Sequence, residues 1–344
     1  MKIAIITQPL HRNYGGLLQN FALQQILIKM GHQPITFDQV GWLPPVLVKL
    51  KIKIKSFLSP NDCFEKFIKK YIHTTSKAKS EEDFRRLDLI IKPDAYIVGS
   101  DQVWRPQYNI FLDSSYLSFT DCKKKIAYAA SFGTDLWEYE DKDVDKFKCL
   151  LNKFSAVSVR EKSAITLCRE HFNLDPKLVL DPTLLLNSSD YDLLIDKNKQ
   201  IKSKFVFTYI LNSSESKRRF VDNYCCNFSC CEVAASFDMN GKNCHGMSVE
   251  NWVFYIKNSS FVICDSFHGT AFSIIMHKPF VVLSNLERGN TRMISLLELL
   301  GLQDRLICDY RDIEKLPNID WNEVDSKIKI FRKESLSFIK KSLL

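Results

Sequence analysis

The residues with the clearest capacity for chemistry lie in the stretch FVICDSFHGTAFSIIMHKPFVVL, residues 261–283. His268 follows an apolar run that predicts a buried strand, and Asp265, Ser266 and Gly269 flank it. A helix should begin at this point, and the amides of a helix N-terminus attract anions. A histidine placed there can give or take a proton near neutral pH. The alternative interpretation is a helix cap beside a histidine that packs in the core.

Polar residues also follow two earlier predicted strands, at the edge where open α/β sheets bind ligands. After KIAIIT, the residues Asn13, Gly15 and Gly16 open a helix, where glycine permits close approach to the backbone. After AYIV come Ser100 and Asp101, and this carboxylate can accept hydrogen bonds from a sugar or act as a base. A capped helix at the first position and an aspartate N-cap at the second are the alternatives.

Arginines stand at two further predicted strand ends. Arg160 ends the strand AVSVR, and Arg288, Asn290 and Arg292 follow the strand FVVL. Arginine binds carboxylate and phosphate groups through two parallel hydrogen bonds, which lysine cannot do. Several basic groups on one rim therefore predict an anionic substrate. A surface ion pair with Glu161 is the alternative interpretation of Arg160.

Short apolar strands alternate with amphipathic helices along the chain, which is typical of βαβ units and parallel sheets. A chain of 344 residues is too long for one hydrophobic core. The sequence therefore predicts an α/β fold of two doubly wound Rossmann-like domains that face a cleft. We expect them to cover residues 1–190, with a basic insertion at 42–79, and residues 200–344. A polar linker joins them, and the C-terminal amphipathic helix can pack back across both.

Composition narrows the class of protein. The chain has no apolar run long enough to span a membrane and no signal-peptide pattern, which predicts a cytoplasmic protein. The net charge of +8 is not accompanied by the aromatic and basic pattern of nucleic-acid binding, so we expect no nucleic-acid partner. The lysines of residues 49–55 predict a solvated face. Peripheral contact of residues 42–57 with the inner face of the membrane is the alternative.

The cysteines do not favour a metal site. Eleven cysteines without a secretory signal predict reduced thiols. The densest group is CCNFSCC, residues 225–231, with Cys244 and His245 downstream, and it lacks the paired spacing of zinc sites. We therefore expect small buried side chains there, and no metal.

Several short motifs occur together in a fixed order. They are NYGGLLQNFALQ, IVGSDQVW, AYAASFG, SVREKSA, VLDPTLLL and SFHGTAFSIIMHKPF. This ordered set, from about residue 3 to residue 306, resembles the polysaccharide pyruvyl transferase family. The resemblance implies a GT-B-like fold, with the acceptor on the first domain and the donor on the second. It also implies a bacterial enzyme of capsule, exopolysaccharide or cell-surface glycan biosynthesis.

The resemblance implies a reaction as well. Phosphoenolpyruvate is the donor substrate, no cofactor is needed, and the pyruvyl group becomes a ketal across two hydroxyls of one sugar residue. The acceptor is expected to be a lipid-linked oligosaccharide. His268 matches the family's histidine and is the expected general acid or base, with Asp101 as a second catalytic group. Arg160 matches an arginine that binds the donor.

The chain departs from the family pattern at one point. Better-studied members carry arginine and leucine where this chain has Ser266 and Phe267. We expect Ser266 with the remaining rim residues to bind the donor instead, and either Arg288 or Arg292 can take over the anion-holding role, with Arg292 favoured. The complete expected donor set is Arg160, Ser266, Gly269, Arg288, Asn290 and Arg292, and the acceptor set is Asn13, Gly15, Gly16, Ser100 and Asp101.

Two other functions stay open. A GT-B glycosyltransferase that uses a nucleotide-activated sugar would need a carboxylate for the ribose, for which Glu250 and Glu287 are candidates. A carbohydrate-binding protein without catalytic activity is the third possibility, and the concentration of arginine and histidine at strand ends argues against it.

Overall fold

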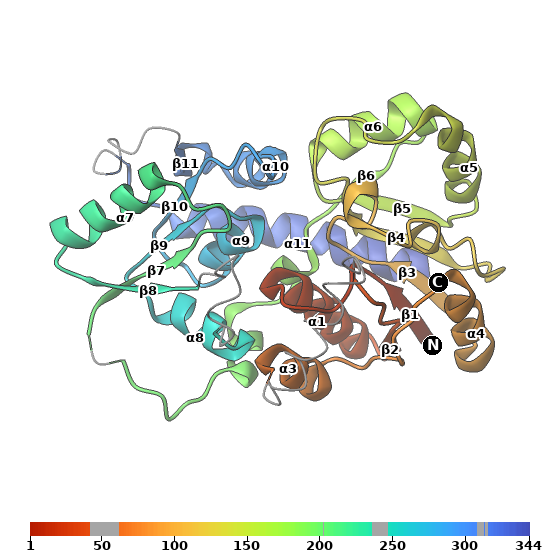
Figure 1. Cartoon of the computed structure of the whole chain (residues 1–344), viewed down its shortest axis with the longest axis horizontal. Helices are drawn as coiled ribbons and strands as arrows, with labels where there is room; N and C mark the ends of the chain where they lie inside the picture. The colour runs from red at the N-terminus through yellow and green to blue at the C-terminus, as the bar shows by residue number, and fades with distance from the viewer. Residues whose placement is uncertain (42–61, 202, 236–246, 308–312, 314–315) are drawn as a thin grey trace, which may run out of the picture. The chain divides into compact units, whose positions relative to one another are not determined.

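The computed structural model describes residues 1–41, 62–201, 203–235, 247–307, 313 and 316–344. The chain divides into two compact units: unit 1 comprises residues 1–185 and 332–344, and unit 2 comprises residues 186–331. Each unit is built on its own parallel sheet with helices packed against it (Figure 1). This α/β architecture of two doubly wound units confirms the predicted fold class. The last thirteen residues belong to unit 1, whereas we expected them in the second domain.

Unit 1 contains a six-stranded parallel sheet. In spatial order its strands are β2 (Gln33–Thr36), β1 (Lys2–Ile6), β3 (Ala95–Val98), β4 (Lys125–Ala130), β5 (Ala156–Val159) and β6 (Lys177–Leu178). Its helices are α1 (Tyr14–Lys29), α3 (Cys63–Tyr71), α4 (Glu81–Ile91), α5 (Asp141–Leu151) and α6 (Lys162–Phe172). Because β2 and β3 lie on opposite sides of β1, the strand order reverses there, and the carboxyl ends of β1 and β3 form the switch point.

The sequence of unit 1 explains its layers. Strand β3 has the apolar sequence AYIV and is fully buried, as expected of a central parallel strand covered on both faces. Helix α1 is also buried on nearly all sides, and its polar residues bond inward: Gln24 donates to Thr36 Oγ1 at 2.9 Å and to the His73 carbonyl at 2.9 Å. Helices α5 and α6 run side by side (Figure 1).

The expected basic insertion is partly a packed element. Residues 63–71 form α3, and the ring of Phe67 lies 6.2 Å from that of Phe21 in α1. The parallel bridges Thr36–Thr74 and Gln39–Ala78 then extend the edge of the sheet. The lysines of residues 49–55 lie outside the described residues.

Unit 2 contains a five-stranded parallel sheet. In spatial order its strands are β11 (Leu306–Ile307), β10 (Phe280–Leu283), β9 (Phe261–Cys264), β7 (Phe205–Tyr209) and β8 (Cys231–Ala234). Its helices are α7 (Glu215–Asn227), α8 (Val249–Asn258), α9 (Phe267–Ile275) and α10 (Thr291–Leu300). Strand β7 has β8 on one side and β9 on the other, so a second switch point lies at the carboxyl ends of β7 and β9.

The expected linker is a structured part of unit 2. Residues 188–194 form a short 3-10 helix that begins with a capping box. Its Tyr191 is fully buried and lies edge-on to the ring of Phe272 in α9, at 4.9 Å between centroids. Tyr191 therefore anchors residues 188–194 to the core of unit 2, although the surrounding sequence is polar.

Helix α11 (Trp321–Leu343) contributes to both units. In unit 2, His277 Nε2 lies 2.9 Å from Asp325 Oδ1. In unit 1, Ser335 Oγ accepts a hydrogen bond from the Leu180 amide at 3.0 Å, and the ring of Phe338 lies 6.2 Å from that of Tyr128. The amphipathic pattern of the sequence predicted this helix.

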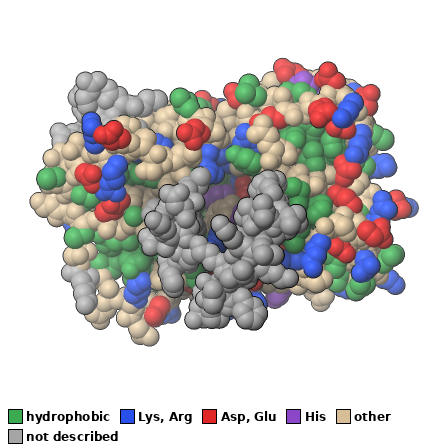
Figure 2. All heavy atoms as spheres, viewed as in Figure 1, with side chains coloured by type: hydrophobic (Ala, Val, Ile, Leu, Met, Phe, Trp, Pro, Cys, Tyr) green, Lys and Arg blue, Asp and Glu red, His purple; other side chains and the backbone are tan. Residues whose placement is uncertain are grey.

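The modest positive charge is not gathered into a basic patch on the described face of unit 1 that Figure 2 shows. Basic and acidic side chains are interspersed there, with hydrophobic side chains between them. A polyanion such as nucleic acid usually binds a surface on which Lys and Arg are clustered.

Candidate active site

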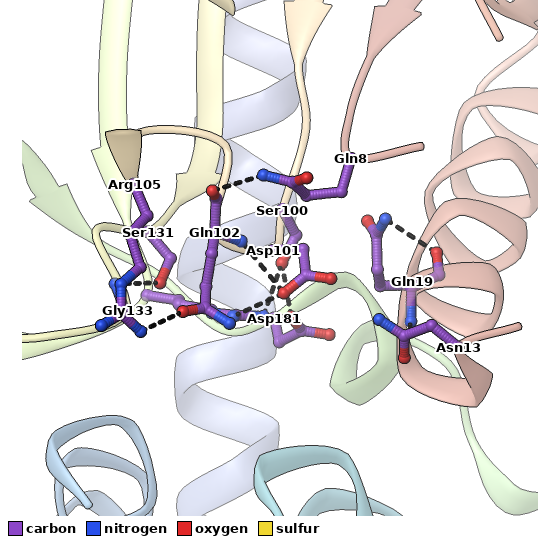
Figure 3. A network of polar contacts seen from close by, with 12 residues as sticks. Gln8, Asn13, Gln19, Ser100, Asp101, Gln102, Arg105, Ser131, Gly133 and Asp181 are labelled. Atoms are coloured by element: carbon purple, nitrogen blue, oxygen red, sulfur yellow. Dashed lines mark hydrogen bonds and ion pairs between the residues drawn. The ribbon is translucent and has the colours of Figure 1, made fainter. Parts of the chain in front are cut away.

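The switch point of unit 1 brings together two of the predicted groups, the one that begins at Asn13 and the one formed by Ser100 and Asp101. Asn13 caps α1 by accepting a hydrogen bond from the Gly16 amide at 3.1 Å. Gln19, one turn later, donates to Thr7 Oγ1 at 2.9 Å, and Thr7 donates to the Ser100 carbonyl at 3.0 Å. These bonds fix the start of α1 beside the ends of β1 and β3. Figure 3 shows how the side chains of this edge are arranged.

Asp101 has the most unusual backbone at this edge. Its φ is 75°, which is left-handed and uncommon outside glycine, and the residue is only 5% exposed. Such a conformation costs about 1–3 kcal/mol and is concentrated at functional sites. Its Oδ1 accepts from the Gln102 amide at 3.0 Å, and a Cβ atom on Gly16 would lie 3.5 Å from its Oδ2. One carboxylate oxygen therefore faces the first turn of α1, where Gly15 and Gly16 are buried and carry no side chain.

Arg160 is buried in a cluster of carboxylates, with a side chain that is 1% exposed. Its Nη2 lies 3.2 Å from Asp101 Oδ1, its Nη1 lies 2.8 Å from Asp181 Oδ2, and its Nε lies 3.7 Å from Glu161 Oε2. Burial opposes the charge, but Asp181, Asp101 and Glu161 outweigh burial and raise the pKa of Arg160. Arg160 is therefore an internal cation and not part of an exposed surface pair.

Asp181 and Glu161 were not among the predicted site residues. Asp181 Oδ1 accepts from the amide and the hydroxyl of Thr183, and Asp181 Oδ2 accepts from Ser100 Oγ at 2.5 Å. Glu161 Oε1 accepts from the amides of Phe132, at 3.1 Å, and of the next residue. Both residues follow strands, so they could have been predicted from the sequence if every acidic residue after a predicted strand had been considered.

The corresponding edge of unit 2 is organised by Asp265, which is 1% exposed. Its oxygens accept from the amides of Leu211, at 2.6 Å, and Asn212, at 3.1 Å. They also accept from Lys217 Nζ at 2.7 Å and from Asn285 Nδ2 at 3.0 Å. The carboxylate thus joins the ends of β7, β9 and β10. Its partners among the described residues are these four donors.

His268 is the second residue of α9 and is 8% exposed. Ser266 caps this helix by accepting from the Gly269 amide at 3.0 Å. A Cβ atom on Gly269 would lie 2.8 Å from both Cys264 Cβ and Ser266 Oγ. Glycine is therefore needed for close packing of α9 on β9, and this packing holds His268 in the helix turn where the positive end of the dipole lies.

The arginines after β10 differ in their placement. Arg288 Nε donates to Asn212 Oδ1 at 2.7 Å, and Asn285 Nδ2 also donates to that oxygen at 3.1 Å. Asn290 Oδ1 accepts from the Asn285 amide at 2.9 Å and closes the loop. Arg292 lies in the first turn of α10. Asn212 was not predicted as a site residue, because nothing in its sequence neighbourhood shows that it meets Arg288.

The clustered cysteines show no metal site in the part of the chain that is described. Cys225 and Cys230 are partly buried, Cys226 and Cys231 are exposed, and all four are free. The expectation of buried side chains was therefore wrong for Cys226 and Cys231. No group of three His, Cys, Asp or Glu side chains among the described residues is placed to hold a metal ion. Cys244 and His245 lie outside those residues.

The two edges differ in their chemistry. Unit 1 has a fixed carboxylate beside a glycine-rich helix start, which can accept hydrogen bonds from hydroxyl groups. Unit 2 has a histidine at the N-terminus of α9 and, after β10, an arginine oriented by Asn212, and both are suited to an anion. A sequence model of the family described as polysaccharide pyruvyl transferase matches residues 13–287.

The chain belongs to the polysaccharide pyruvyl transferase family. This confirms the resemblance noted in the sequence and places the protein among transferases of polysaccharide biosynthesis with a sugar or polysaccharide acceptor. A search of curated proteins gives no match. No helix in the described part of the chain is both long and apolar enough to cross a membrane.

Several solved structures have the same fold as this member of the pyruvyl transferase family, although their sequences are only distantly similar to it. A UDP-bound structure of MnaA from S. aureus has a TM-score of 0.54 and 11% identity, covering 98% of this chain and 90% of that one. A UDP-N-acetylglucosamine 2-epimerase from Rickettsia bellii has a TM-score of 0.53 and 10% identity, covering 100% and 97%. A glycosyltransferase from Rickettsia africae has a TM-score of 0.51 and 10% identity, covering 99% and 94%. The chain therefore has a GT-B-like fold, as predicted.

Proposed function

We propose that this protein transfers the pyruvyl group of phosphoenolpyruvate onto two hydroxyls of one sugar residue, forming a ketal during capsule, exopolysaccharide or cell-surface glycan synthesis. Family membership supports the class of reaction. The observation that carries the assignment is the placement of His268 in the first turn of α9, two residues after the capping Ser266. A proton donor at a helix N-terminus suits a substrate that is an anion and must accept a proton on carbon.

The proposed reaction joins one phosphoenolpyruvate to two sugar hydroxyls and releases one phosphate. The methylene carbon of phosphoenolpyruvate takes a proton and becomes a methyl group, while the first sugar hydroxyl adds to the central carbon. The bond from that carbon to the phosphate oxygen then breaks, and the second hydroxyl adds in its place. Of the two hydroxyl protons, one is accounted for by the new methyl group and the other by the released phosphate.

We assign the donor to unit 2. His268 gives the proton to the methylene carbon, and Arg288 and Arg292 hold the carboxylate and phosphate, with Ser266 fixing the helix start beside them. Support comes from the hydrogen bond between Arg288 Nε and Asn212 Oδ1, which orients the guanidinium from the segment that follows β7. A preorganised arginine stabilises an anion better than a mobile one.

We assign the acceptor to unit 1. Asp101 takes the proton of an attacking hydroxyl, and Asn13, Gly15, Gly16 and Ser100 line the place of the sugar. The support is that Asp101 Oδ2 would lie 3.5 Å from a Cβ atom on Gly16, so a carboxylate oxygen, which can accept a hydrogen bond from a sugar hydroxyl, lies beside the glycine-rich start of α1.

We also propose that the acceptor is a lipid-linked oligosaccharide, handled at the inner face of the membrane. The sequence of residues 42–57 supports this, because lysines alternate with aliphatic residues there. Flotation with vesicles of anionic lipid should recover the protein, and neutral vesicles should not. Equal recovery with both, or recovery with neither, would remove the membrane from the proposal.

The enzymatic proposal is tested by measuring phosphate released from phosphoenolpyruvate in the presence of a panel of glycosides with neighbouring free hydroxyls. Release should require both substrates and should be lost in His268→Asn. A parallel panel with UDP-activated sugars tests the glycosyltransferase alternative. Transfer from a UDP-sugar without any reaction of phosphoenolpyruvate would overturn the proposal.

A further inference from the structure

One buried ion cluster connects four strand ends of unit 1. Arg160 follows β5 and contacts Asp101, after β3, and Asp181, after β6. The neighbouring Glu161 accepts from the amides of Phe132, after β4, and of the residue that follows it. Three carboxylates thus surround one guanidinium at the edge of the sheet where Asp101 lies.

The charges of this cluster disfavour the binding of a further anion beside Arg160. The side chains of Arg160, Asp181 and Glu161 are at most 1% exposed, and that of Asp101 is 7% exposed. Three negative groups against one positive group leave the surroundings of Arg160 net negative. A phosphate or carboxylate entering there would lose its hydration and meet repulsion from three like charges. The guanidinium is therefore poorly suited to hold phosphoenolpyruvate.

The same contacts are well suited to fixing Asp101. Its left-handed backbone, with φ at 75°, persists only where surrounding groups hold it. Arg160 Nη2 and the Gln102 amide both donate to Oδ1. With one oxygen held from two directions, the other is aimed toward Gly16 in α1.

We propose that Arg160 is a positioning residue for Asp101, with Asp181 and Glu161 as its fixed counter-charges, and that it does not hold the donor as its place in the family motif suggests. This inference rests on the proposed function for its kinetic meaning. Asp181 shares Nη1 of Arg160 with Ser100, so it sets the guanidinium in the plane from which Nη2 reaches Asp101. The cluster acts on the acceptor side of the reaction.

The test compares Arg160→Lys and Asp181→Asn with the wild type in steady-state phosphate release, varying phosphoenolpyruvate. Each variant should lower kcat by about tenfold to a hundredfold, the scale expected when a reacting group is displaced slightly. KM for phosphoenolpyruvate should stay within about threefold of the wild type, because the donor contacts are untouched. Arg305→Lys, a buried arginine of unit 2, is the matched control and should change neither constant.

A second measurement does not depend on turnover. Hydrogen exchange of the backbone amides of residues 100–105 should become faster in both variants and stay unchanged in the control. If Arg160→Lys is unstable, the exchange can still be measured on Asp181→Asn, because asparagine keeps the shape of the aspartate side chain. A wild type that never releases phosphate would overturn the proposed function alone. A rise in KM for phosphoenolpyruvate with unchanged kcat, or unchanged exchange at residues 100–105, would overturn the positioning role.

Discussion

Asp265 should be the residue on which the edge of unit 2 depends most. Replacing it by asparagine keeps the shape of the side chain but removes its charge, while Lys217 stays buried with a side chain only 7% exposed. Breaking one partner of a buried ion pair costs about 3–5 kcal/mol. Lys217 still donates to the Asn212 carbonyl at 3.0 Å, so we expect the lower end, about 3 kcal/mol. For a unit of roughly 150 residues this lowers Tm by about 10 °C.

Calorimetry of Asp265→Asn measures this effect on the thermal transition of unit 2. The double variant Asp265→Asn with Lys217→Met should recover much of the lost Tm, because it removes the uncompensated buried charge. Asp222→Asn breaks the exposed ion pair with Arg218 and serves as the control, with no measurable change expected. The reasoning fails if Asp265→Asn melts like the wild type, or if the double variant melts no higher than the single one.

Three further outcomes follow from the same contacts. His268→Asn should lower kcat by about 10²–10⁴-fold with an unchanged Tm, and near-normal turnover would make this histidine structural. Arg288→Ala and Arg292→Ala should each raise KM for phosphoenolpyruvate, and an unchanged KM in either variant removes that arginine from the donor site. Burial raises the pKa of the Cys264 thiol to about 12, so iodoacetamide at mildly alkaline pH should label exposed Cys226 and spare Cys264 until the protein unfolds; labelling of both at equal rates would contradict this.

The sequence predicted the elements well because each is specified locally. Apolar runs such as AYIV and FVVL, bounded by polar residues, gave the strands, and the cap at Asn13 marked the start of α1. Two local features misled the prediction. The polar composition of residues 187–203 indicated a linker, although the buried Tyr191 ties its first half to the core. The many lysines of residues 42–79 indicated one insertion, although Phe67 anchors a helix within it.

The candidate site was predictable only as a set of strand ends. Alternation of strands and helices shows that Asp101 and Arg160 lie at the same edge of one sheet, but not that they form an ion pair. The contact between Asp265 and Lys217 joins residues 48 positions apart. The sequence shows that one is acidic and the other basic, but not that they pair with each other. The sequence also does not show that Arg160 is buried, because an arginine at a strand end has the same sequence pattern whether it faces solvent or three carboxylates.

We propose above all that this chain makes a ketal from phosphoenolpyruvate. The most direct measurement uses phosphoenolpyruvate labelled with carbon-13 at its central carbon, together with a glycoside acceptor, and follows the product by NMR and mass spectrometry. We expect the label to appear as a ketal carbon bonded to two oxygens of one sugar residue, with one phosphate released for each ketal formed. Label that stays in phosphoenolpyruvate, or emerges only as free pyruvate, with every acceptor tested would contradict it.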